Sequence, residues 1–279
     1  MPQFYELIDS GDGRRLERFG NRTLIRPSKF SVWKPRENEK LWADADASYV
    51  HKAGWKYKSA KFQEWVSKGD DLSLKLKLQE NGQIGFFPEH VAYLPDIREA
   101  LRRQQASKPK VLNLFAYTGM ASIAALQEKA DVTHVDLSKK VLDWAKENFE
   151  LNGLSTARFI REDAVTFMER EVRRGNLYDV VIADPPSFSR VSDNNEWKLE
   201  EVLTDLIELC VSLLKAEGAT LFLTSHHFES GGHVMANILL DSVCRNNRSN
   251  PSLSTKELSI AEVKTGRVLP AGFLVQANW

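Results

Sequence analysis

The sequence predicts an α/β fold, in which helices cover both faces of a mostly parallel β-sheet, with a small β-rich domain at the N-terminus. After residue 109, short apolar runs alternate with helix-forming segments, and several of these runs end in an aspartate. Before residue 83, short runs are instead separated by Gly, Asn and Asp, as in a β-meander. We expect residues 1–82 to form the small domain and residues 83–279 the large one.

Composition narrows the class of protein. A hydrophobic content of 42% and a charged content of 27% are typical of an ordinary globular protein. No apolar run approaches the roughly 18 residues of a membrane helix, and the first residues lack a secretory signal pattern. The two cysteines, Cys210 and Cys244, are far apart, which argues against a disulfide or zinc framework and favours the reducing cytoplasm.

The stretch from Lys110 to Asp136 is the most informative part of the chain. Lys110–Phe115 predicts a buried strand, Ala116–Gly119 a turn, Met120–Lys129 a helix, and Val132–Val135 a second strand that ends at Asp136. This is half of a Rossmann-like nucleotide-binding unit. The turn presents backbone N–H groups to a ligand at a helix N-terminus, and the acid accepts ribose hydroxyls.

The composition of the turn favours one cofactor over another. A dinucleotide pyrophosphate requires the pattern G-x-G-x-x-G, so that the backbone can approach it closely. The turn here contains one glycine, Gly119, and is walled by Phe115 and Tyr117. We therefore predict S-adenosylmethionine as the cofactor, and disfavour a nicotinamide oxidoreductase.

Two later strands also deliver acidic residues to the carboxyl edge of the predicted sheet. Asp163 follows the strand predicted at Ala157–Ile160, where it can meet an adenine amino group or cap the helix that begins at Ala164. The apolar run Tyr178–Ala183 leads into D-P-P-S-F, residues 184–188. Asp184 and the neighbouring backbone carbonyls, whose conformation two prolines restrict, can accept hydrogen bonds from a base. Phe188 can stack on the face of that base.

The first hundred residues combine basic and aromatic side chains. Residues 1–109 carry 20 Lys/Arg against 15 Asp/Glu, and the remainder carries 18 against 23. Between Phe30 and Trp65, lysines alternate with tryptophans and tyrosines, which suits contact with single-stranded nucleic acid. The alternative, which we favour, is that most of the tryptophans are core residues and that the lysines lie around them at the solvent-exposed surface. Further on, Leu72–Gln79 and Gln83–Phe87 predict a hairpin around Asn81-Gly82.

In order and spacing, F-A-Y-T-G, V-D-L-S, R-E-D-A and D-P-P-S-F resemble motifs I to IV of class I S-adenosylmethionine-dependent methyltransferases. The stretch from about residue 83 to 230 is similar to the large-subunit ribosomal RNA methyltransferases, in a short branch without a PUA domain. The resemblance implies a Rossmann-like sheet and RNA, ribosomal in that group, as substrate. The cofactor would contact His90, Phe115, Ala116, Tyr117, Thr118, Gly119, Asp136, Leu137, Ser138, Asp163, Ala164 and Asp184. Asp184, Pro185 and Phe188 would orient the accepting base.

One departure from that group concerns the chemistry. Transfer to cytosine C5 needs a cysteine thiolate, and the corresponding branch carries a cysteine after the fifth strand. This chain has Thr224-Ser225-His226-His227 there. We therefore predict direct in-line transfer to a nitrogen, and no metal. His226 and His227 could be pocket walls or a proton acceptor, but we favour the alternative that they lie in a polar loop. A methyltransferase for small molecules or proteins, and a binding module that has lost activity, remain alternatives.

Overall fold

The structure is a computed structural model that describes residues 4–69, 71–155, 157–192, 195–226 and 231–279, without the side chains of 188–197 and Glu200. The chain divides into two compact units. The first unit comprises Met1–Glu89 and Ser259–Ala271, and the second comprises His90–Leu258 and Gly272–Trp279. Each is described by itself. A boundary between independently folding domains after residue 82 stays a prediction.

A seven-stranded sheet forms the second unit, in the order β10-β9-β8-β11-β14-β16-β15. Strands β8 to β11 and β14 run parallel, and β16 lies antiparallel to β14. The central strands β11 and β14 are buried along their whole length, which explains their continuous apolar sequences. The strands are β8 (Lys110–Leu114), β9 (Asp131–Asp136), β10 (Arg158–Arg161), β11 (Val180–Ala183), β14 (Thr220–Ser225), β15 (Ser252–Ala261) and β16 (Val268–Asn278).

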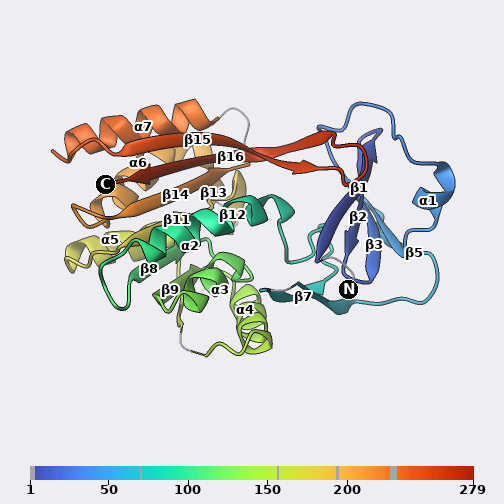
Figure 1. The fold of residues 1–279 in the computed structure, drawn as a ribbon, viewed down its shortest axis with the longest axis horizontal. Helices are drawn as coiled ribbons and strands as arrows, with labels where there is room; N and C mark the ends of the chain where they lie inside the picture. The colour runs from blue at the N-terminus through green and yellow to red at the C-terminus, as the bar shows by residue number, and fades with distance from the viewer. Residues whose placement is uncertain (1–3, 70, 156, 193–194, 227–230) are drawn as a thin grey trace. The chain divides into compact units, whose positions relative to one another are not determined.

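Two groups of helices flank this sheet (Figure 1). From β8 the chain adds β9 and then β10 toward one edge of the sheet, and after β10 it returns to add β11 and β14 on the other side of β8. Right-handed connections therefore place α3 and α4 on one face of the sheet and α5, α6 and α7 on the other. In agreement, α6 packs against α5 and α7, and α2 packs against α3. The elements are η1, a 3₁₀ helix (Pro88–Tyr93), α2 (Leu94–Arg102), α3 (Met120–Gln127), α4 (Lys139–Leu151), α5 (Ala164–Arg173), α6 (Leu199–Ser212) and α7 (Gly232–Arg245). A small hairpin, β12 (Phe188–Ser192) with β13 (Asn195–Lys198), follows β11. The predicted α/β fold is confirmed.

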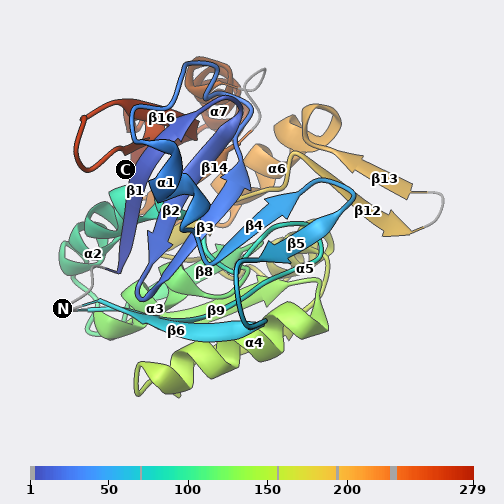
Figure 2. The ribbon, with the colours of Figure 1, turned by 90° about the vertical axis from the view of Figure 1, so that its right-hand side faces the viewer.

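The first unit contains the predicted β-meander within a five-stranded sheet of order β1-β2-β3-β4-β5 (Figure 2). The first three strands are antiparallel neighbours, and β4 pairs parallel with β3. Trp42 and Trp65 are buried, as expected if most tryptophans of the aromatic-basic stretch are core residues. The elements are β1 (Tyr5–Gly11), β2 (Arg14–Phe19), β3 (Arg22–Pro27), α1 (Glu39–Ala43), β4 (Ala47–Val50), β5 (Gly54–Tyr57), β6 (Glu64–Lys68) and β7 (Ser73–Lys77).

The predicted hairpin of Leu72–Gln79 with Gln83–Phe87 forms only next to its turn, where the Gln79 N–H donates to the Gln83 carbonyl at 2.9 Å and the Lys77 N–H donates to the Ile84 carbonyl at 3.1 Å. A turn does form at Asn81-Gly82, where Gly82 N–H donates to the Gln79 carbonyl at 3.0 Å. However, β7 pairs with β6, which precedes it in the chain. Residues 83–87 form no regular strand, and Ile84 and Phe86 are buried. Phe86 lies in an aromatic cluster with Phe4, Tyr5 and Phe19.

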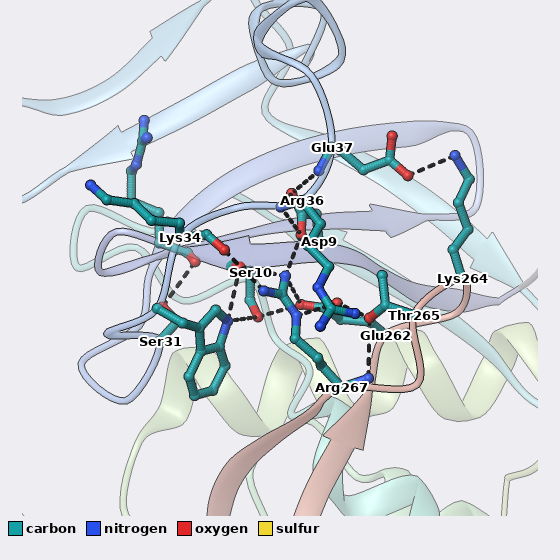
Figure 3. A network of polar contacts seen from close by, with 12 residues as sticks. Asp9, Ser10, Ser31, Lys34, Arg36, Glu37, Glu262, Lys264, Thr265 and Arg267 are labelled. Carbon is teal, nitrogen blue, oxygen red and sulfur yellow. Dashed lines mark hydrogen bonds and ion pairs between the residues drawn. The ribbon is translucent and has the colours of Figure 1, made fainter.

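A buried polar network ties the end of the β15–β16 hairpin into the first unit (Figure 3). The Arg267 guanidinium donates to Asp9 Oδ1 at 2.7 Å and to Glu262 Oε1 at 2.8 Å. Asp9 and Glu262 are 0% and 1% exposed. Ser10 Oγ also donates to Glu262, at 2.6 Å. Because each buried carboxylate has several donors, the network is satisfied, and it explains why residues 259–271 belong to the first unit.

Among the residues that the structure describes, no helix is both long enough and apolar enough to cross a lipid bilayer.

Candidate active site

The acidic residues predicted from sequence lie at the carboxyl edge of the parallel strands of the second unit. Leu114 at the end of β8 pairs with Ala183 at the end of β11, and Ala183 pairs with Leu223 of β14. Phe115, Asp184 and Thr224 therefore follow positions that are side by side. The strand order also reverses between β8 and β11, which is where open α/β sheets bind ligands.

The loop Phe115–Gly119 has an unusual backbone. Phe115, Tyr117 and Gly119 have φ values of 52°, 50° and 96°. Such angles are unfavourable for the two aromatic residues, so the surrounding structure must hold them. At Gly119, a Cβ atom would lie 2.5 Å from Phe149 Cε1, so this position requires glycine for its angle and for the space.

Asp136 and Asn148 hold this loop from two directions. Asp136 Oδ2 accepts from the Tyr117 N–H at 3.0 Å, and its Oδ1 accepts from the Ser138 N–H at 2.9 Å. Burial raises the pKa of Asp136, although both hydrogen bonds oppose that rise. Asn148 Nδ2 donates to the Thr118 carbonyl at 2.9 Å. Asp136 thus joins the loop to the start of α4, and its remaining lone pairs are those a ribose could use.

A third support for the loop was missed by the sequence analysis. His134 is fully buried on β9, and its Nε2 lies 3.2 Å from the Tyr117 carbonyl. Its Nδ1 lies 3.0 Å from Ser122 Oγ, which accepts in turn from Asn113 Nδ2 at 2.8 Å. The carbonyl can only accept, so Nε2 carries the proton and Nδ1 accepts from Ser122. A polar residue inside the apolar run D-V-T-H-V-D was the available signal.

Other predicted cofactor residues occupy the neighbouring strand ends. Asp163 follows β10 and caps α5, accepting from the Thr166 N–H at 2.9 Å, so the expected capping role is confirmed. Ala164 is buried beside it, Leu137 is exposed, and Ser138 caps α4. Contacts of these residues with a cofactor stay predictions.

Asp184 is the centre of a cluster that includes two histidines. Its Oδ1 lies 3.1 Å from His226 Nε2, and its Oδ2 lies 3.4 Å from His90 Nε2. The two Nε2 atoms are 3.1 Å apart. Thr224 Oγ1 donates a short hydrogen bond to Oδ1. The site thus joins η1 to the ends of β11 and β14.

The charge of Asp184 is set by these neighbours. Burial alone would raise the pKa of its carboxyl. Instead, positive charge on His90 and His226, with the hydrogen bonds from His226 and Thr224, holds the pKa well below its usual range. Asp184 is therefore ionised at neutral pH. The side chains of His90, Asp184 and His226 are 10%, 16% and 24% exposed, so solvent reaches the cluster mainly on the His226 side.

The remaining site predictions have mixed outcomes. His90, expected at the amino-acid end of the cofactor, contacts Asp184 and His226, and its contact with a cofactor stays a prediction. Pro185 is buried next to Asp184. Phe188 begins β12, but its side chain lies outside the described part of the structure, as does the whole of His227.

Cys210 does not have the environment of a nucleophile. Cys210 is fully buried on α6, with its Sγ 3.8 Å from Met168 Sδ, and burial raises the pKa of its thiol to about 12. Cys244 is exposed on α7. A useful nucleophilic cysteine has a lowered pKa.

Comparison with known proteins agrees with this geometry. Ribosomal RNA large subunit methyltransferase K/L of Pseudoalteromonas atlantica is 38% identical over 151 residues, which are 53% of this chain and 20% of that protein. Ribosomal RNA large subunit methyltransferase K of Neisseria meningitidis is 30% identical over 243 residues, 80% of this chain and 66% of that one. The chain thus spans a fifth of the first relative's length and just under two thirds of the second's.

A solved structure matches over the whole chain. The S-adenosylmethionine-dependent methyltransferase from Agrobacterium tumefaciens has a TM-score of 0.92 and 32% identity, covering 100% of this chain and 91% of that one. A family model described as S-adenosylmethionine-dependent methyltransferase matches residues 40–254, and the chain belongs to this family.

Proposed function

We propose that this protein transfers the methyl group of S-adenosylmethionine to a ring or amino nitrogen of a base in ribosomal RNA. The observation that carries the proposal is the position of Asp184-Pro185-Pro186 beside the loop Phe115–Gly119 at one sheet edge. The large-subunit ribosomal RNA methyltransferases among its relatives support the choice of substrate.

The cofactor would lie along the strand ends of the second unit. Its methionine end would contact the loop Phe115–Gly119, whose backbone is fixed by Asp136, His134 and Asn148. Asp136 would accept the ribose hydroxyls, and Asp163 with Ala164 would contact the adenine. Since the sulfonium already activates the methyl group, the protein mainly has to align donor and acceptor, which can supply on the order of 7–11 kcal/mol of the barrier.

A nitrogen acceptor fits the residues around the site. The nitrogen lone pair attacks the methyl carbon as the carbon–sulfur bond breaks, and no covalent enzyme intermediate is needed. An amino nitrogen would donate a hydrogen bond to the ionised Asp184 and lose its proton to water after the transfer. Transfer to cytosine C5 would instead need a thiolate, and the buried Cys210 has a raised pKa.

The first unit offers a surface suited to single-stranded RNA. A cleft of about 650 Å³ is lined by Tyr49, Trp55 and Tyr57, with Lys52 and Lys77 at the same surface. Trp55 Nε1 donates to the Gln79 carbonyl at 2.7 Å, and the Tyr49 hydroxyl donates to the Glu80 carbonyl at 2.8 Å. These bonds fix the two rings, and fixed aromatic rings stack on unpaired bases. A ribosomal substrate would place the enzyme in the cytoplasm, where the two free cysteines stay reduced.

The test is methyl transfer from labelled S-adenosylmethionine to ribosomal RNA, protein and metabolite fractions, followed by nucleoside analysis of the labelled product. We expect label in RNA on a base nitrogen, at least about 100-fold less label with Asp184→Ala, and full transfer with Cys210→Ser and Cys244→Ser. Label in protein or metabolites alone would reject the RNA substrate. Label on a cytosine carbon, or transfer lost in a folded cysteine variant, would reject the nitrogen acceptor.

A further inference from the structure

Three side chains that are far apart in sequence meet at the carboxyl edge of β11 and β14. His90 comes from η1, Asp184 follows β11, and His226 follows β14. Each offers one ligand atom to the same small space, and two imidazoles with a carboxylate are a ligand set typical of divalent transition metals. We propose that His90, Asp184 and His226 bind a divalent first-row transition-metal ion, with Zn²⁺ as the test case.

The distances between the ligand atoms match such a site. The two Nε2 atoms are 3.1 Å apart, His226 Nε2 lies 3.1 Å from Asp184 Oδ1, and His90 Nε2 lies 3.4 Å from the other carboxylate oxygen, Asp184 Oδ2. Ligands about 2.1 Å from one ion are separated by roughly 3.0 Å in octahedral and roughly 3.4 Å in tetrahedral geometry. The observed distances lie within this interval.

Hydrogen bonding alone accounts less well for the same arrangement. An imidazole Nε2 has one outward direction, which holds either a hydrogen or a lone pair. His226 Nε2 lies at the same distance, 3.1 Å, from Asp184 Oδ1 and from His90 Nε2, so one N–H cannot point well at both. An ion between the two imidazoles and the carboxylate would be bound by all three side chains at once.

The surroundings also suit a ligand set. Thr224 is buried and donates to Asp184 Oδ1, as second partners of metal-binding carboxylates do. The rings of His90 and Tyr93 are 5.4 Å apart, and Tyr93 stacks on Phe222 of β14, which fixes η1 against the end of that strand. With three protein ligands, an ion keeps open positions that substrate can occupy.

This inference contradicts the expectation from sequence that the protein uses no metal, an expectation that nothing so far tests. It shares His90, Asp184 and His226 with the proposed methyl-transfer site, but it does not rest on that function, because metal binding is measured without turnover. Metal binding without methyl transfer would reject the proposed function alone. Methyl transfer by a protein that binds no metal would reject this inference alone.

The experiment uses the full chain without an affinity tag, stripped with a chelator and then titrated calorimetrically with Zn²⁺. Co²⁺ replaces Zn²⁺ for absorption spectra, which report the ligand geometry. We expect one ion per chain, and at least about 100-fold weaker binding in His90→Gln and His226→Gln. Glutamine preserves hydrogen bonding in the cluster but is a poor transition-metal ligand, so these variants distinguish a metal site from a cluster held by hydrogen bonds alone. Thr224→Val should weaken binding by roughly 10–100-fold.

His233→Ala is the matched control, because His233 is exposed on α7 and should leave Zn²⁺ binding unchanged. Circular dichroism of each metal-free variant checks that it is folded, and Zn²⁺ should raise the melting temperature of the wild-type chain but not of His226→Gln. Absence of stoichiometric Zn²⁺ and Co²⁺ binding by the wild-type chain would overturn the inference. So would equal affinity in wild type and a folded His226→Gln.

Discussion

At the residue scale, the loop Phe115–Gly119 is a strained segment held by its neighbours. Backbone angles such as those of Phe115 and Tyr117 cost of order 1–3 kcal/mol each, and they persist only where other contacts enforce them. Asp136, His134 and Asn148 each bind a different backbone group of the loop. The shape of the loop is therefore fixed before any ligand binds, which reduces the entropy lost on binding.

Gly119→Ala should disrupt this loop. The new methyl group would meet Phe149 Cε1 at 2.5 Å and would also suffer from the φ of 96°, so we expect a loss of about 1–3 kcal/mol in the free energy of unfolding. Gly153→Ala is the control, because Gly153 has a φ of 68° but open space around its Cα. Urea unfolding measures the stability of each variant, and calorimetric titration measures its affinity for S-adenosylmethionine. Equal losses in the two variants would show that the contact with Phe149 has no effect.

His134 should make stability depend on pH. Burial lowers its pKa from 6.5 to about 3, although the Tyr117 carbonyl opposes this shift. Below pH 6.5 the unfolded chain binds a proton that the folded chain does not, so stability falls as pH falls toward 3. Between pH 7 and pH 5, His134 should remove roughly 2 kcal/mol.

The measurement is urea unfolding at pH 7 and pH 5 for the wild type and for His134→Gln, which does not titrate. The other histidines are present in both proteins, so they cancel in the comparison. The variant should lose roughly 2 kcal/mol less than the wild type on acidification. Parallel pH profiles would mean that the folded protein protonates His134 normally.

At the element scale, the β15–β16 hairpin shows how a buried network of charged side chains determines in which of the two units a segment packs. Its strands extend the sheet of the second unit, while residues 259–271 belong to the first. Leu269 and Ile260 pack with Leu7 in the core of the first unit. Arg267 adds the charge that two buried carboxylates require.

Arg267→Ala should therefore destabilise the protein strongly. It leaves Asp9 and Glu262 buried without their cation, and losing one partner of a buried ion pair typically costs about 3–5 kcal/mol. Lys264→Ala is the control, since its ion pair with Glu37 has the lysine 66% exposed and should contribute less than about 1 kcal/mol. Chemical denaturation compares the two. A small effect of Arg267→Ala would mean that the carboxylates become protonated or hydrated in the variant.

The short extent of the predicted hairpin has its explanation at this scale as well. Asn-Gly favours a turn, and the turn is present, but a turn does not determine how far the flanking residues pair. In β6 and β7, Trp65 lies opposite Leu76, and both are buried. The strand pairing thus followed the burial of side chains on one face, which a local turn signal does not report.

At the scale of the whole molecule, the proposed function divides between the two units. The second would hold the cofactor and the acceptor base, and the first would bind flanking RNA through its aromatic cleft. The excess of basic residues in the first part of the chain agrees with contact to phosphates.

Replacing the tryptophan of the cleft tests this division. Trp55→Ala should weaken binding to single-stranded ribosomal RNA fragments by about 1–3 kcal/mol, the usual contribution of one stacked base. Trp55→Phe retains a ring and should bind nearly as well, although it loses the bond to Gln79. Fluorescence anisotropy measures RNA affinity, and S-adenosylmethionine affinity should stay constant. Equal RNA affinity for Trp55→Ala and the wild type would reject the proposal that the cleft binds RNA.

The sequence by itself determined the order of strands and helices in the second unit, the cofactor class and the candidate residues at the strand ends. It could do so because a buried parallel sheet needs apolar runs, and because Gly119, Asp136, Asp163 and Asp184 each follow such a run. These are local patterns, readable within a few residues.

Only the tertiary structure brought His90, Asp184 and His226 together, and only it showed His134 in contact with the loop Phe115–Gly119. Residues 90 and 226 are 136 positions apart, so no spacing rule could join them. The pairing of β8, β11 and β14 decides which strand ends are neighbours, and that pairing depends on the packing of the whole sheet.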